Sequence, residues 1–114
     1  MTTIICDIDG TLCRHNDNQF SSMQLLPGTR EKLIEWQKKG YNLILITGRR
    51  ESTRLVTEEQ LSRAGIAYDQ LIMGVGPGPR YLINDMKPGS LEETAIAINL
   101  IRDDGYKGIS KVEI

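Results

Sequence analysis

The chain has 114 residues, a length that suits one domain with a single hydrophobic core. Apolar residues make up 39% of the chain and charged residues 25%, and these shares exclude a disordered or fibrous protein. Its 14 basic and 15 acidic residues give a formal net charge of -1, which excludes a general electrostatic attraction to nucleic acid or anionic membrane. We therefore expect a single domain, residues 1–114, in which any phosphate binding is local.

The cysteines indicate a reducing environment. Cys6 and Cys13 fit neither a disulfide framework nor a metal-ligand pattern, because they lack the usual spacing and the chain has 1 histidine. Met1 leads almost directly into an apolar run, which leaves no room for a signal peptide, and no window reaches transmembrane length. We expect a soluble, cytoplasmic protein without a membrane partner.

Residues 3–8 predict a buried strand, because β-branched apolar residues run through them almost continuously. Successive side chains of a strand point to opposite faces, so Asp7 and Asp9 leave it on one side, with Ile8 opposite. Two acids this close repel each other unless a cation, hydrogen-bond donors or a shared proton offsets their charge. A Mg²⁺ site or an acid/base pair is therefore the expected role of the sequence Asp-Ile-Asp.

The polar stretch 14–27 has no clear period and predicts a loop or small flap beside these acids, with His15 as an exposed loop residue. Thr29 is the expected N-cap of a helix that continues to Lys39 and ends at Gly40. Residues 41–47 predict a second strand, which Gly48 breaks at once.

A second helix is expected from Ser52 to Ala64, with Gly65 closing it, followed by a short strand at 68–73. The segment Gly74–Pro79 must be a loop, because its three glycines and two prolines defeat both helix and strand. It serves either as a substrate-side loop or as a plain connector. The remaining predicted elements are a strand at 80–84, a helix at 90–103 and a strand at 107–112.

The second half of the expected fold depends on the helix at 90–103. Its residues Leu91, Ala95 and Ile98 recur at helical spacing and are expected to cover the sheet. Strand and helix then alternate along the whole chain, which predicts an α/β fold, a three-layer Rossmann-like sandwich with a mainly parallel sheet of about five strands. The carboxyl ends of its strands would gather Asp7, Thr47 and Asp85 at one edge.

Three stretches in this order, DIDGTL, LILITGRR and YLINDMKPG, resemble the motifs of the haloacid dehalogenase-like (HAD) phosphohydrolases. The resemblance covers nearly the whole chain, and its first motif is the most specific. Residues 51–74 further resemble the polynucleotide kinase type of 3′-phosphatase, although that segment often ends in arginine where this chain has Gly74. Small sugar-phosphate phosphatases share the same outline.

The resemblance implies a division of work between the acids. Asp7 would be the nucleophile that forms an aspartyl-phosphate, and Asp9 would be the general acid and base. Asp7, the backbone carbonyl of Asp9, and Asp85 would hold Mg²⁺, the expected cofactor. A phosphorylated sugar, nucleotide or polynucleotide end would be the substrate.

The second motif supplies the implied phosphate site. Thr47 would donate its hydroxyl, Gly48 would let the backbone approach closely, and Arg49 would contact phosphate or substrate, since guanidinium groups match phosphate geometry. Relatives also carry a lysine shortly before the last acid, and this chain has none there. Arg80 or Lys87 would supply that charge, and Lys87 is preferred because it lies at the active edge.

The links between the motifs are too short for a cap domain, so a capless protein is expected. Either a large substrate or a neighbour in a homo-oligomer would then cover the site. Two alternatives to a phosphatase stay open. The chain could be a metal-dependent module with weak or no turnover that binds phosphate or regulates a partner, or a phosphotransferase of the same fold.

Overall fold

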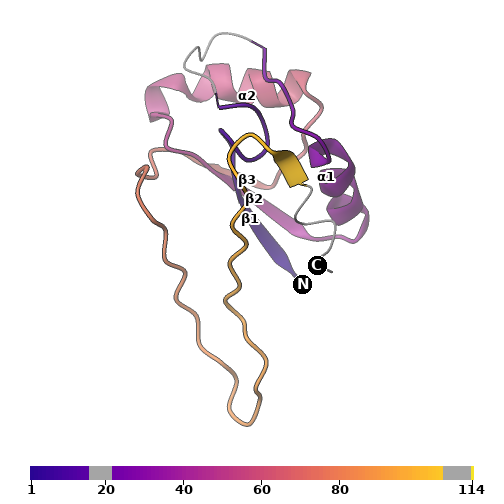
Figure 1. The fold of residues 1–114 in the computed structure, drawn as a ribbon, viewed down its shortest axis with the longest axis vertical. Helices are drawn as coiled ribbons and strands as arrows, with labels where there is room; N and C mark the ends of the chain where they lie inside the picture. The colour runs from indigo at the N-terminus through magenta and orange to yellow at the C-terminus, as the bar shows by residue number, and fades with distance from the viewer. Residues whose placement is uncertain (16–21, 107–113) are drawn as a thin grey trace.

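The computed structural model describes residues 1–15, 22–106 and 114 of the chain. Three strands alternate with two α-helices in its first two thirds (Figure 1). The elements in order are β1 (Thr3–Asp7), α1 (Thr29–Lys38), β2 (Asn42–Ile46), the short 3₁₀ helix η1 (Glu51–Thr53), α2 (Arg54–Arg63) and β3 (Gln70–Ile72). This alternation confirms the predicted α/β class over this part of the chain.

The sheet is parallel, with the strand order β1-β2-β3. Cys6 pairs with Leu45, and Leu45 pairs with Leu71, so these apolar side chains share one face. They form one cluster with Trp36 of α1 and Leu61 of α2. Both helices therefore pack on the same face of the sheet, as right-handed β-α-β crossovers in this strand order require.

The opposite face of the sheet is partly open. Ile5 of β1 and Ile72 of β3 lie on this face and are 48% and 44% exposed. The helix expected at 90–103 was to cover it, but that prediction is wrong, because these residues form no helix in the structure. Leu91, expected in the core, is 95% exposed.

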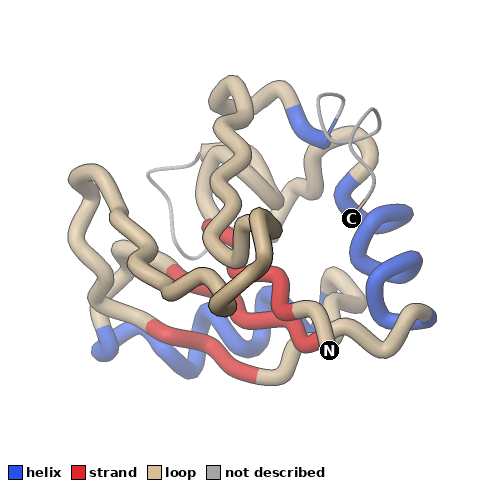
Figure 2. The backbone as a smooth tube through the Cα atoms, turned by 90° about the horizontal axis from the view of Figure 1, so that it is seen from below, coloured by secondary structure: helices blue, strands red, loops and turns tan. Residues whose placement is uncertain are grey.

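The strand expected at 80–84 is likewise not formed. Beyond Val75 the chain leaves the body as two extended limbs (Figure 1), which Figure 2 draws as loop. The limbs meet at a turn, where the Ser90 amide donates to the Lys87 carbonyl. Arg80 to Asn84 form no ladder with β1, so β1 is an edge strand of the described sheet. The fifth expected strand, 107–112, lies outside the described residues.

After this excursion the chain returns to the body beside the first turn. The Asp103 amide donates to the Gly10 carbonyl at 2.9 Å, and the Tyr106 amide donates to the Pro27 carbonyl at 2.9 Å. The Tyr106 ring then packs beside Trp36, with 5.8 Å between ring centroids. Residues 103–106 thus close the core over β1 and α1.

The start of α1 differs from the prediction. Gly28, with φ at 83°, is the N-cap, and Thr29 is the first residue of the helix. The Thr29 hydroxyl instead donates to the Leu12 carbonyl at 2.8 Å and is fully buried. None of the helices in the described residues is long and apolar enough to cross a bilayer.

Candidate functional site

The turn after β1 positions the first two acids. Gly10 adopts φ 86°, a conformation that L side chains avoid, and the Leu12 amide closes the turn on the Ile8 carbonyl at 2.9 Å. Ile8 and Leu12 are both fully buried, so the turn is anchored in the core. Asp7 and Asp9 flank Ile8 and are held at the carboxyl end of β1.

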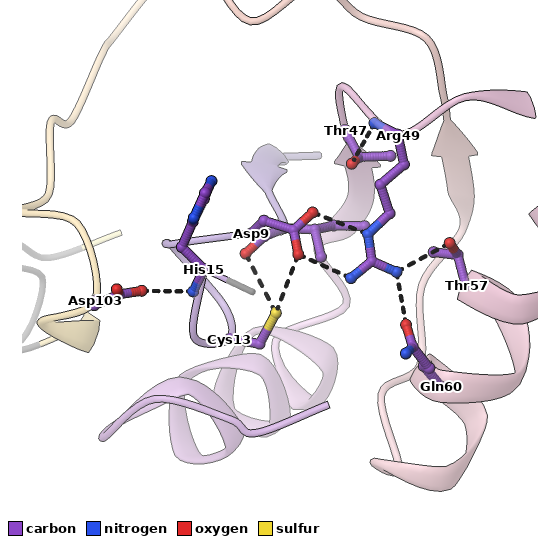
Figure 3. Close-up of polar contacts among 9 residues, drawn as sticks. Asp9, Cys13, His15, Thr47, Arg49, Thr57, Gln60 and Asp103 are labelled. Carbon is purple, nitrogen blue, oxygen red and sulfur yellow. Dashed lines mark hydrogen bonds and ion pairs between the residues drawn. The ribbon is translucent and has the colours of Figure 1, made fainter. Parts of the chain in front are cut away.

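Asp9 forms a bidentate ion pair with Arg49. The Arg49 Nε donates to one Asp9 oxygen at 2.9 Å, and Nη2 donates to the other at 2.8 Å (Figure 3). The side chain of Arg49 is 8% exposed and that of Asp9 22%. The hydrogen bonds that Arg49 donates to Asp9 raise the pKa of Arg49, so this guanidinium stays charged. The expectation was a substrate contact, whereas the structure joins Arg49 to Asp9.

Asp7 meets a different arginine. Arg80 Nη1 donates to Asp7 Oδ1 at 3.1 Å, and the Thr11 hydroxyl lies 3.3 Å from Oδ2. Lys87, the preferred source of positive charge, lies at the turn between the limbs, and its ammonium forms no hydrogen bond or ion pair within the described ranges. The structure therefore brings Arg80 to Asp7 and leaves Lys87 apart.

Thr47 lies directly after β2 and is 1% exposed. Its hydroxyl oxygen accepts the Arg49 amide at 3.1 Å, and its carbonyl accepts the Val75 amide at 3.0 Å. Gly48 allows the close approach of the two segments, because a Cβ there would make a tight contact of 3.1 Å with the Val75 carbonyl oxygen. The start of the Gly74–Pro79 loop is thus tied to the second motif.

The third acid is not part of the cluster. Asp85 lies on the exposed excursion, where its carbonyl accepts the Thr94 hydroxyl. No three acidic, histidine or cysteine side chains of the described chain come close enough to hold a metal. Since Asp7 and Asp9 are also each paired with an arginine, these side chains, as they lie, do not fit a Mg²⁺ ion.

Cys13 contacts Asp9 through its thiol, and His15 follows in the same segment. Burial raises the pKa of Cys13 to about 12, with a further contribution from the charge of Asp9. The Cys13 thiol lies 3.9 Å from Asp9 Oδ1. His15 is exposed, as expected, and its backbone amide donates to Asp103 at 2.6 Å.

The sequence prediction missed two residues of this cluster, Thr57 and Gln60 of α2. Both are buried, and both accept hydrogen bonds from Arg49 Nη1, at 3.1 and 2.6 Å (Figure 3). They lie three residues apart, beside the buried Leu61, so they belong to the inward face of the helix. Polar residues on an inward face were the available indication of a buried partner.

The protein is an α/β domain with a parallel sheet and paired acids at the end of its first strand, and its fold is similar to that of HAD-like proteins. Residues 4–84 match the family described as "PITM 1-3, LNS2 domain". The chain belongs to the LNS2 domain family, since this match spans well over half of it. No match is found among curated proteins.

Solved structures agree with the class. One chain of the Pnkp1/Rnl/Hen1 complex is 30% identical with a TM-score of 0.56, and the match covers 70% of this chain and 30% of that one. A D,D-heptose 1,7-bisphosphate phosphatase from B. bronchiseptica, complexed with magnesium and phosphate, is 22% identical with a TM-score of 0.54, covering 68% and 52%.

A structural-genomics target from Vibrio cholerae is 21% identical with a TM-score of 0.56, covering 73% of this chain and 80% of that one. The two likenesses near 20% identity support the fold alone. The chain spans about a third of the Pnkp1/Rnl/Hen1 chain that it matches. The predicted HAD-like fold is thereby confirmed, and the absence of a cap stays a prediction.

Proposed function

We propose that the chain is a phosphomonoester hydrolase in which Asp7 is the nucleophile. The observation that carries the proposal is the placement of Asp7 and Asp9 on one turn at the carboxyl end of β1, with Thr47 at the end of the adjacent β2. In parallel α/β sheets this edge is where ligands bind. The heptose bisphosphate phosphatase, whose structure holds phosphate, supports the same reading.

The proposed reaction has two steps. An Asp7 oxygen forms a bond to phosphorus while the bond to the ester oxygen breaks, and Asp9 gives a proton to that oxygen. A water molecule then attacks the aspartyl-phosphate and transfers a proton to Asp9, which releases phosphate and restores Asp7. The bidentate contact with Arg49 fixes the orientation of the Asp9 carboxylate for both proton transfers.

Three groups would orient the phosphoryl group and the nucleophile. The Thr47 hydroxyl accepts the Arg49 amide and keeps its own hydrogen for a phosphoryl oxygen. Gly48 permits close approach of the backbone, and Arg80 supplies positive charge at Asp7. The proposed substrates are phosphorylated sugars, nucleotides or polynucleotide ends. In support, one matched structure is an RNA repair complex and another a sugar-phosphate phosphatase.

Dependence on Mg²⁺ belongs to the same proposal, and the magnesium in the heptose bisphosphate phosphatase supports it. Asp7 and Asp9 are paired with arginines and Asp85 lies apart, so both steps above are carried by the side chains of the chain itself. We also propose that the protein is soluble and cytoplasmic, and that a neighbour in a homo-oligomer covers the site.

A chromogenic phosphomonoester tests the proposal. We expect hydrolysis with Mg²⁺, loss of hydrolysis with EDTA, and no turnover by Asp7→Asn, because the amide is a poor nucleophile. Arg50→Gln, at an exposed position, is the matched control and should keep the wild-type rate. Turnover by Asp7→Asn would contradict the nucleophile assignment, whereas binding of phosphate without turnover by the wild type would favour the non-catalytic module.

A further inference from the structure

Arg49 connects the site to helix α2. Its Nε and Nη2 donate to Asp9, and its Nη1 donates to both Thr57 and Gln60 (Figure 3). A guanidinium has five N–H groups, so these four hydrogen bonds leave one N–H group of Arg49 available. With its side chain 8% exposed, Arg49 has little capacity left for a phosphate.

Thr57 and Gln60 are the unusual part of this network. They are 0% and 8% exposed, on the inward face of α2, where an apolar residue would pack without cost. A buried hydroxyl or amide is costly unless it forms hydrogen bonds. Their contacts with Arg49 satisfy that requirement and give both residues a reason to be polar.

The planar guanidinium makes this arrangement directional. When two acceptors hold Nη1, the edge that carries Nε and Nη2 can turn only a little, and this edge faces both oxygens of Asp9. An arginine without such anchors samples many rotamers, and the loss of this freedom on pairing with Asp9 would cost conformational entropy. The anchors on α2 therefore preset the orientation of Asp9.

We propose that Thr57 and Gln60 are positioning residues, which hold Arg49 so that it fixes the carboxylate of Asp9 for proton transfer. The proposal rests on the proposed function for its catalytic consequence, but its structural part does not depend on turnover. It also assigns Arg49 to the orientation of Asp9 in place of direct phosphate recognition. Proton transfer is sensitive to such orientation, because a small displacement of a reacting group costs rate.

Kinetics give the first test. Thr57→Val keeps the shape of the side chain and removes the hydroxyl, and Gln60→Met keeps its length and removes the amide. In each variant we expect kcat to fall on the order of tenfold, with KM within about twofold. Thr57→Ser should restore kcat, and Thr53→Val, at the start of the same helix, is the matched control.

A double-variant cycle separates orientation from a general loss of stability. In the Arg49→Met background, Thr57→Val should cause no further loss of kcat, because it acts through Arg49. An unchanged kcat in Thr57→Val, or additive losses in the double variant, would overturn the proposal.

NMR of the Arg49 Nε–H gives a readout that needs no activity. In the wild type we expect a slowly exchanging resonance, assigned by its loss in Arg49→Lys, because Nε is buried in the ion pair. The resonance should exchange faster in Thr57→Val and in Gln60→Met while the melting temperature stays within a few degrees. Equal exchange in wild type and variants would overturn the positioning role. A slowly exchanging resonance in a protein without phosphatase activity would instead refute the proposed function alone.

Discussion

At the scale of single residues, the site separates two acids that the sequence presents as a pair. Asp7 contacts Arg80 and Thr11, while Asp9 is held by Arg49. The Asp-x-Asp spacing predicts their common edge, because alternation along a strand is a local property. Their different partners come from 40 and 73 residues further along the chain, and no local pattern contains that information.

The thiols of Cys6 and Cys13 lead to a prediction about the dependence of stability on pH. Burial raises the pKa of Cys6 and of Cys13 from 9.0 to about 12. Thiols of the unfolded chain lose their protons first as the pH rises, so the free energy of unfolding is unaffected by them below pH 9 and should fall between pH 9 and 12. The fall is at most about 1.4 kcal/mol per pH unit for each thiol.

Urea unfolding at a series of alkaline pH values measures this fall. Cys13→Ala should show a shallower decline than the wild type above pH 9, because it has one thiol fewer to ionise. Below pH 9 the two proteins should differ by a constant amount. Parallel curves over the whole range would contradict the raised pKa of Cys13.

At the scale of elements, the sequence predicts β1, α1, β2, α2 and β3 to within a few residues, because apolar runs mark the strands and a glycine follows each element closely. The segment 91–101 has an apolar helical period, yet it forms no helix. An amphipathic helix gains most of its stability from packing, and β-branched residues such as Thr94, Ile96 and Ile98 lower its intrinsic stability. Because the segment extends away from the body, an apolar helix face there would have no surface to pack against.

Two glycines provide an element-scale prediction. Gly105 has φ at 77°, and a Cβ there would collide with the carbonyl of Pro27, at the point where the chain returns to the core. Gly40 ends α1 with φ at 75°, but a Cβ there would meet nothing within 4 Å. Gly105→Ala combines strain with a clash, so we expect it to cost about 2–4 kcal/mol.

Gly40→Ala is the matched control and should cost about 1 kcal/mol, from backbone strain alone. Denaturant unfolding of both variants measures the difference. A loss equal to that of Gly40→Ala would mean that residues 103–106 shift freely, and that the Tyr106 contact with Pro27 does not hold the core closed.

At the scale of the whole molecule, burial is unequal between the two halves of the chain. The two helices cover one face of the sheet. The molecule measures 50 × 27 × 25 Å, and its long dimension comes from the two limbs that extend away from the sheet and helices (Figure 1). Tyr81, Ile83 and Leu91 on these limbs are 89%, 90% and 95% exposed. Apolar side chains on an extended segment beside a partly open sheet face are unusual for a monomer.

This inequality predicts the pattern of amide hydrogen exchange. In β2, amides are paired on both sides of the strand, so Leu43–Ile46 should exchange slowly. Residues 77–100 belong to no ladder or helix, so their amides should exchange rapidly, with Ser90 and Glu92 slower because they donate within the turn. Mass spectrometry of peptic fragments separates the two regions. Protection of 91–101 equal to that of α2 would contradict this pattern and would mean that the amides of the segment are hydrogen-bonded in solution.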